Sequence, residues 1–245
     1  MIVPPALLLS ALALCQSPAP STAAVRAAYA EADDLYLHRN RGRDLELSVS
    51  VLEGRLAQDP ADAQALWRLG RSLLRLGEEA RGTEERLALF ERAEGSIERS
   101  LRIDERSAEA HYWCGLAMGR AGQERGMLRS LFLVGPIRRH MRRALELDPR
   151  MGRAHQVLGE MAKEIPGFAG GSKRRAVAEL EEAVRLSPGY SAAYISLAKA
   201  CVEVGEKEKA RAVLRRVLEL KAPDDPAEHG ENVAEAGRML SELGP

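Results

Sequence analysis

Apolar residues recur every three or four positions through most of this chain, the spacing that places them on one face of a helix. The same helix ending also returns four times, at residues 100–105, 144–149, 183–188 and 217–222. Each copy has small and apolar residues on one face, followed by a polar or charged residue. Corresponding residues are 34 to 44 positions apart, and a period of about 34 is typical of repeats built from two helices. The pattern therefore predicts an array of helix pairs.

The array is expected to be all-α, because the composition favours helix and no stretch alternates between apolar and polar residues as a strand does. Such repeats stack into a right-handed α-solenoid, whose ends need covering helices. The chain then divides into four segments. They are a signal segment at 1–21, a capping helix pair at 22–60, the repeat array at 61–222 and a C-terminal capping helix at 223–245.

The first helix of each unit carries a small residue where it is expected to approach its partner helix. Gly70, Gly115 and Gly159 hold this position in three units, and Ala198 holds it in the fourth. Because glycine lacks a side chain, it lets two helices come close together. Together with the small residues of the second helices and the terminal Asp-Pro pairs, these positions resemble tetratricopeptide repeats over residues 61–222.

Two units contain insertions between their first and second helices, at residues 122–136 and 165–172. Both are unusually apolar for connections. Two interpretations are open: the insertions fold over one edge of the array as additional core, or they wall an apolar pocket or partner site. The residues expected to form such a pocket are Leu128, Leu131, Phe132, Pro166 and Phe168.

Three stretches are similar to one subgroup of tetratricopeptide proteins. They are LFLVGPI at 131–137, IPGFAGGSK at 165–173 and VGEKEKA at 204–210. The subgroup is the T component (TatT-like) associated with bacterial periplasmic TRAP transporters, which metazoan regulators of microtubule dynamics also resemble. The resemblance implies a binding protein with a protein partner, such as the solute-binding subunit of a transporter, or with a small apolar or anionic ligand.

The resemblance also places outward positions of the first helices along a concave groove. Aromatic residues at one end and cations along its length suit an extended peptide or an organic anion. The alternative is that any superhelix exposes such a mixture. The residues assigned to the groove are Trp67, Arg71, Arg75, Tyr112, Arg120, Arg153, Gln156, Lys163 and Lys199.

Composition and motifs exclude several functions. Lys and Arg equal Asp and Glu at 36 each, so no net field favours nucleic acid or an acidic membrane. We find no motif for a nucleophile, a metal site or a phosphate-binding loop. His111 and Cys114 lie one turn apart, but two ligands do not make a zinc site and both hold packing positions. No enzyme activity, metal or cofactor is predicted, and Cys114 and Cys201 are expected as buried thiols.

The first residues of the chain resemble an export signal. The apolar run at 6–14 is too short to span a bilayer, and small residues suited to cleavage follow at 17–24. No Lys or Arg precedes the run, which departs from the usual pattern, and Cys15 is a candidate for lipidation. We therefore expect a non-catalytic binding protein that is exported to the periplasm and reaches the membrane only through such a lipid. The alternative is a cytosolic scaffold that binds proteins only.

Overall fold

The structure, a computed structural model, describes residues 22–167 and 170–244. Within these ranges the chain forms eleven α-helices and no strand. They follow each other as five pairs and a final single helix, so the expected all-α solenoid is confirmed. The helices are α1 (Thr22–Leu37), α2 (Asp44–Gln58), α3 (Ala63–Glu79), α4 (Thr83–Ile103), α5 (Ala108–Glu124), α6 (Met127–Leu147), α7 (Gly152–Glu164), α8 (Lys173–Leu186), α9 (Ser191–Glu203), α10 (Lys207–Glu219) and α11 (Pro226–Leu243).

Side-chain caps begin several helices where the sequence supplies Ser or Asp. Asp62 and Ser107 accept hydrogen bonds from the backbone N–H three residues further on, at 3.0 Å and 3.2 Å. Ser172 and Asp225 cap α8 and α11 in the same way. Each cap satisfies one of the backbone donors that a helix start leaves unpaired. These helix starts are therefore encoded locally.

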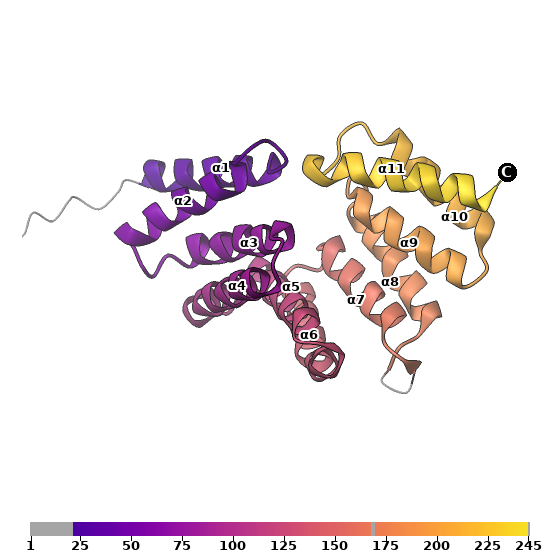
Figure 1. The fold of residues 1–245 in the computed structure, drawn as a ribbon, viewed down its shortest axis with the longest axis horizontal. Coiled ribbons are helices and arrows are strands. Elements are labelled where there is room, and N and C mark those ends of the chain that lie inside the picture. The colour runs from indigo at the N-terminus through magenta and orange to yellow at the C-terminus, as the bar shows by residue number, and fades with distance from the viewer. Residues whose placement is uncertain (1–21, 168–169, 245) are drawn as a thin grey trace, which may run out of the picture.

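The stack of helix pairs curls into a C shape that brings its two ends together (Figure 1). The pair α1 and α2 packs on α3, and α11 covers the other end by packing on α9 and α10. Arg39, in the loop after α1, forms ion pairs with Asp225 (2.7 Å) and Glu228 (2.9 Å) at the start of α11. The array therefore closes on itself, and its inner face surrounds a common space.

Glycines of the first helices lie where the second helices pack against them. A Cβ atom added to Gly70 would lie 2.9 Å from the backbone oxygen of Ala93 and would overlap the side chain of Ile97. One added to Gly159 would lie 2.6 Å from Cγ of Leu180. Normal contacts between carbon atoms are about 3.5–4.0 Å, so the predicted close approach of the paired helices is confirmed.

Replacing Gly70 by alanine is therefore expected to destabilise the fold by about 1.5 kcal/mol, because overpacking a tight core contact costs about 1–3 kcal/mol. The matched control is Gly95→Ala in α4, whose added Cβ would have no atom within 4 Å. This second change should stabilise the protein by up to about 1 kcal/mol, since alanine favours helix. Urea denaturation measures both effects, and a shift of the same sign and size in the two variants would contradict the explanation.

The first insertion differs from the prediction of a connection over residues 122–136. Instead, α6 begins at Met127 and continues through Pro136 to Leu147. Proline removes one backbone hydrogen bond from a helix, here the bond to the carbonyl of Phe132. The Phe132 side chain is 83% exposed, so this part of the helix is open to water, which can satisfy the carbonyl. Most of the insertion is therefore an extension of the second helix of its unit.

The buried side chains form two clusters along the array. One extends from α1 to α7 and the other from α8 to α11, where Ala236 of the capping helix is fully buried. Cys114 lies in the first cluster and Cys201 in the second, and both are free thiols, as predicted. None of the helices in the described ranges is both long and apolar enough to cross a membrane.

Candidate functional site

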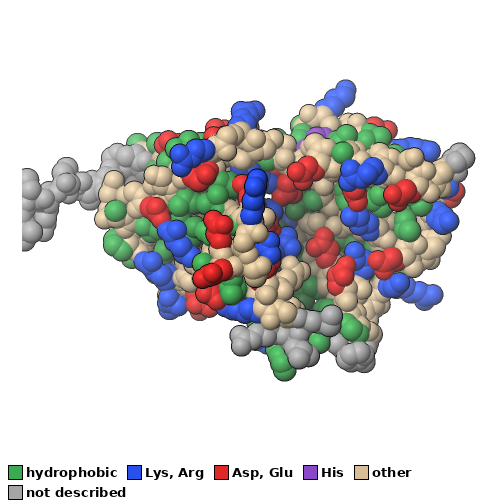
Figure 2. All heavy atoms as spheres, in the orientation of Figure 1, with side chains coloured by type: hydrophobic (Ala, Val, Ile, Leu, Met, Phe, Trp, Pro, Cys, Tyr) green, Lys and Arg blue, Asp and Glu red, His purple; other side chains and the backbone are tan. Residues whose placement is uncertain are grey.

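The inner face of the array surrounds a space of about 480 Å³, which we name the central cavity. It lies between α1, α3 and α5 on one side and the segments that begin α7, α9 and α11 on the other. Figure 2 shows charged side chains of both signs close together over the middle of the molecule. The lining of the central cavity is Asp33, Tyr36, Leu37, Arg71, Arg75, Tyr112, Trp113, Asp148, Arg150, Met151, Gly152, Arg153, Ser187, Tyr190, Asp224 and Asp225.

Arg71 on α3 shows how the fold holds cations in this lining. Its guanidinium carbon lies 3.8 Å from the ring centroid of Tyr36 and 5.4 Å from that of Trp67, within the range of cation–π contact. Arg71 also forms an ion pair with Asp33 (2.6 Å). Burial lowers the pKa of Arg71, and Tyr36 and Asp33 oppose this effect. The buried Nε–H of Arg71 has no acceptor among the described residues, so one of its donors is unsatisfied.

Arg153 on α7 is held by a similar arrangement. Its guanidinium carbon lies 4.8 Å from the ring centroid of Tyr112 and 5.9 Å from that of Trp113, both on α5. Arg153 also forms an ion pair with Glu109. Burial acts against its charge, but Glu109 and Tyr112 outweigh this effect and raise the pKa of Arg153. Trp113 is 2% exposed, and its Nε1–H finds no acceptor in the described part of the chain. A second buried donor in the lining is therefore unsatisfied.

Arg75 connects the central cavity to the closure of the array. It pairs with Glu78 of its own helix (2.7 Å) and with Glu228 of α11 (2.9 Å), and its Nε donates to the hydroxyl of Tyr36 (3.2 Å). Burial opposes the charge of Arg75, but Tyr36 and the two carboxylates raise its pKa well above the usual value. Arg75 is therefore a fixed cation that bridges the first complete repeat and the last helix.

The charges of the lining do not all neutralise one another. Asp33 and Asp225 form ion pairs with arginines of the fold. Arg150 is exposed, and its side chain forms no ion pair with any described residue. Burial raises the pKa of Asp224, which likewise has no ion-pair partner within the described ranges. Among the described residues, the central cavity therefore has a cation and a carboxyl without ion-pair partners in its lining, and two unsatisfied N–H donors are buried in its wall.

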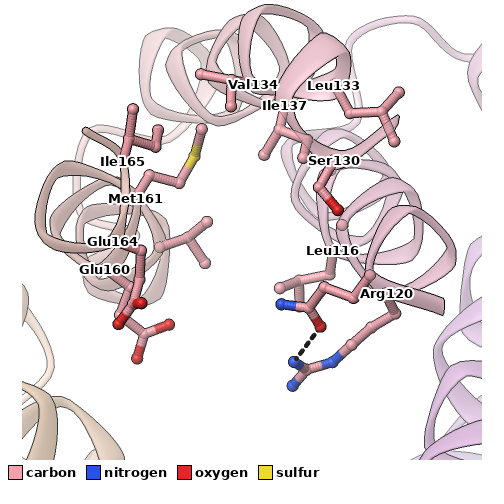
Figure 3. A pocket seen from close by; sticks show the side chains of 14 residues that line it. Leu116, Arg120, Ser130, Leu133, Val134, Ile137, Glu160, Met161, Glu164 and Ile165 are labelled. Carbon is pink, nitrogen blue, oxygen red and sulfur yellow. Dashed lines mark hydrogen bonds between the residues drawn. The ribbon is translucent and has the colours of Figure 1, made fainter. Parts of the chain in front are cut away.

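A second opening lies between α5, α6 and α7 and measures about 220 Å³. We name it the apolar cleft. Figure 3 shows Leu133, Val134 and Ile137 of α6 along one side, with the charged residues of α5 and α7 farther from α6. Its lining is Gly115, Leu116, Gly119, Arg120, Gln123, Ser130, Leu133, Val134, Ile137, Val157, Glu160, Met161, Glu164 and Ile165.

Four of the predicted groove residues lie together in the lining of the central cavity. They are Arg71, Arg75, Tyr112 and Arg153. These residues come from the first helices of three successive units, which is where the repeat pattern placed a concave face. Their role in binding stays a prediction.

The other groove residues lie elsewhere. Trp67 and Gln156 are buried, with 6% and 7% of their surface exposed. Arg120 lines the apolar cleft, Lys163 lines a smaller surface pocket, and Lys199 forms an ion pair with the capping helix α11. The nine residues therefore do not form one continuous groove.

Three of the predicted insert-pocket residues can be placed, and none of the three lines the apolar cleft. Phe132 is 83% exposed and Leu131 is 40% exposed, whereas their neighbours Leu133 and Val134 line the apolar cleft. Because the segment is helical, Phe132 and Val134 point to nearly opposite sides of α6. Pro166 lines the smaller pocket that includes Lys163. Outside what the structure describes lie the Leu128 side chain, Phe168 and the candidate lipidation site Cys15.

The sequence interpretation missed Tyr36, Tyr190 and Asp224 in the central cavity. All three lie in the capping pair or in turns, where the repeat pattern assigns no groove position. Tyr190 is half-buried, and burial raises its pKa well above the usual value. The available signal was the concentration of acidic and aromatic residues in DDLYL at 33–37 and in the PDDP turn at 223–226.

His111, His140 and Cys114 form a polar cluster between α5 and α6. The Nδ1 atoms of the histidines are 3.0 Å apart, and Nε2 of His140 lies 3.7 Å from Sγ of Cys114. Burial lowers the pKa of both histidines and raises the pKa of the Cys114 thiol to about 12. Both ring nitrogens of His140 contact neighbours, and no three His, Cys, Asp or Glu side chains of the described residues are arranged to hold a metal.

The histidine pair predicts that stability decreases in mild acid. The pKa of both histidine rings is lowered in the folded state. In the unfolded chain the rings titrate at about 6.5, so protonation favours the unfolded chain. The contribution of the neutral histidine pair to the free energy of unfolding is therefore complete above about pH 6.5. It is lost as the pH falls towards the lowered pKa values. In urea denaturation between about pH 5 and pH 7, His140→Gln should flatten the dependence of unfolding free energy on pH. An unchanged slope would contradict this assignment.

Solved structures share this architecture. A thermophilic tetratricopeptide repeat protein of Thermus thermophilus matches with a TM-score of 0.69 and 18% identity, covering 88% of this chain and 98% of its own. MamA matches with a TM-score of 0.50 and 21% identity, covering 78% of this chain and 92% of its own. Identities this low show the fold alone. A model of the tetratricopeptide repeat also matches residues 169–229, so this is a tetratricopeptide repeat protein.

Comparison with relatives of known name identifies the family more specifically. Regulator of microtubule dynamics protein 3 of Rattus norvegicus is 25% identical over 171 residues, which cover 63% of this chain and 36% of the relative. The Mus musculus protein of the same name is 24% identical over 206 residues, or 78% of this chain and 43% of the relative. The chain thus spans less than half the length of these relatives. The family model described as regulator of microtubule dynamics protein 1-3 matches residues 28–166, more than half of the chain, and the chain therefore belongs to that family.

Proposed function

We propose that this protein is a non-catalytic scaffold that binds an acidic segment of a partner protein in its central cavity. The observation that carries the proposal is Arg150, an exposed cation of the cavity lining that forms no ion pair with any described residue. The cavity wall holds three further arginines, Arg71, Arg75 and Arg153. The cavity therefore favours a ligand that carries negative charge, and the carboxylates of an acidic peptide supply it.

The architecture supports a peptide as the ligand. Repeat solenoids generally use their concave surfaces for binding proteins, and about 480 Å³ is within the range of about 300–1,000 Å³ of binding pockets. Arg71 and Arg153 are already held by rings and carboxylates, so little side-chain freedom is lost on binding. Asp224 adds an acceptor for the backbone N–H groups of such a peptide.

The test is a selection from a displayed library of random twelve-residue peptides on the immobilised full chain. Enrichment of sequences that contain Asp or Glu is expected, and free peptides of these sequences should bind less tightly as salt is raised. Enrichment of sequences without acidic residues, or no enrichment over the support alone, would overturn the proposal. Fluorescence anisotropy with the recovered peptides gives the affinities.

The partner itself is proposed only by class. The relatives are named as regulators of microtubule dynamics, so a protein connected with microtubules is the first class to test with the selected sequences. The solute-binding subunit of a transporter remains the other candidate, based on the stretches at 131–137 and 165–173. The family and relatives reported above give that second candidate no support.

Export also stays a proposal, since residues 1–21 lie outside the described residues. The apolar run at 6–14 and the small residues after it support removal of this segment or lipidation of Cys15. The intact mass of the protein recovered from its own cell tests the proposal. A shortened or lipidated chain is expected, and an unmodified full-length chain would favour the cytosolic alternative.

A further inference from the structure

The central cavity and the apolar cleft share two walls. Tyr112 of α5 and Arg153 of α7 line the central cavity, and Leu116 and Val157, one helical turn further along the same helices, line the apolar cleft. The first helices α5 and α7 also pack against each other less closely than the other consecutive first helices do. The two openings are therefore consecutive sections of one seam between α5 and α7.

Ion pairs connect the two openings. Glu78 of α3 binds Arg75, which lines the central cavity (2.7 Å), and Arg120, which lines the apolar cleft (2.6 Å). Burial opposes the charge of Glu78, but the two arginines outweigh it and lower its pKa. A polar strip thus continues from the cavity to the cleft, while Leu133, Val134 and Ile137 make most of the side formed by α6 apolar (Figure 3). A ligand that follows the seam meets a charged section first and an apolar section next.

The size of the apolar cleft restricts its occupant. Its volume of about 220 Å³ is smaller than the roughly 300–1,000 Å³ of pockets for drug-sized ligands. A cavity of about 150 Å³ nevertheless holds a benzene molecule. The apolar cleft therefore has room for one large aliphatic or aromatic side chain, and the polar strip beside it suits a peptide backbone.

We infer that the apolar cleft receives an apolar side chain of the same acidic segment that occupies the central cavity. This inference rests on the proposed function and specifies the partner sequence further. Arg153 and Met161 are eight positions apart on α7, a distance of about 12 Å at about 1.5 Å per residue. An extended peptide covers this distance with about four residues at about 3.3 Å each. The segment therefore carries Leu, Met or Phe about four residues from its acidic residues.

The test uses fluorescein-labelled peptides of ten residues, each with one Asp-Glu pair and one Leu in a background of Ser and Thr. The Leu is placed two, four or six residues from the pair in either direction, and a matched set has Ala in its place. At the four-residue spacing, and in one of the two directions, the Leu peptide should bind the full-length protein at least about tenfold more tightly than the matching Ala peptide. Binding of both sets with equal affinity would overturn the inference and leave the proposed function intact. Failure of both sets to bind would count against the proposed function.

Gly119→Leu closes the apolar cleft from within. A Cβ at this position would lie 3.7 Å from Cδ1 of Ile137, an ordinary contact, so the backbone accepts a side chain there. The variant should lose the preference for Leu and keep the affinity for the Ala peptides, whereas Gly54→Leu, with no atom within 4 Å of its added Cβ, should keep both. Val134→Thr puts a hydroxyl into the cleft at nearly constant side-chain size. It tests the Leu preference a second time without requiring the fold to accept a larger residue.

Two results would overturn the assignment. One is a Leu preference that survives both Gly119→Leu and Val134→Thr in variants with unchanged circular dichroism. The other is displacement of the Leu peptide by decanoic acid from the wild-type protein at equal concentration, because it would assign the cleft to a small amphiphile instead of a side chain.

Discussion

Replacing Arg39 by alanine is expected to lower the free energy of unfolding by about 3 kcal/mol, because removal of one partner from a buried ion pair leaves the other charge uncompensated. The Arg39 side chain is 6% exposed, and those of Asp225 and Glu228 are 14% and 26% exposed. Glu228 keeps its bond to Arg75 in the variant, whereas Asp225 loses its ion-pair partner. Arg39 also stacks on Tyr36, with 4.7 Å between the guanidinium carbon and the ring centroid, and that contact is lost too.

Urea denaturation and amide hydrogen exchange measure this effect together. Exchange should accelerate most at the start of α11 and in the loop after α1, because Arg39 connects these two segments. The control is Arg216→Ala, which removes an exposed pair with Glu219 within α10 and should change stability little. Equal stability of both variants, or faster exchange spread evenly over the array, would show that the ends are not held by this contact.

The repeat architecture could be predicted because its signals are local. The apolar spacing, the capping residues at helix starts and the glycines at 70, 115 and 159 each act within one helix pair. The C-terminal capping helix was predicted within residues 223–245 and is observed at Pro226–Leu243. Such features need no knowledge of how many units follow or how strongly the stack curves.

The central cavity could be predicted only in part, because its closure depends on distant segments. Arg39 and Asp225 are 186 positions apart, and their contact follows from the summed curvature of five helix pairs. No pattern within a single repeat carries that information. The extension of α6 was missed for a different reason: a proline in a helix interior usually ends the helix, yet this one lies where the helix is exposed.

Reversing the charge of Arg150 should weaken binding of the selected acidic peptides by about 2 kcal/mol, or roughly 30-fold in Kd, because it places like charges together in the central cavity. Arg150 is suited to this change because its side chain holds no other described part of the fold in place. Its side chain is exposed and forms no ion pair with the described residues, so Arg150→Glu removes no contact of the fold itself. Stability in urea should therefore stay close to that of the wild type, while the dependence of Kd on salt becomes weaker.

The repeat structure supplies a matched control for this variant. Arg106 holds the equivalent place one unit earlier: its backbone N–H donates to Asp104 at 3.0 Å, as that of Arg150 donates to Asp148 at 3.0 Å. Arg106 is also exposed but does not line the central cavity. Both charge reversals change the net charge of the protein equally. A difference in peptide affinity between the two variants therefore arises from the central cavity and not from the overall field of the protein. A loss of affinity that Arg106→Glu reproduces would place the acidic segment elsewhere on the protein.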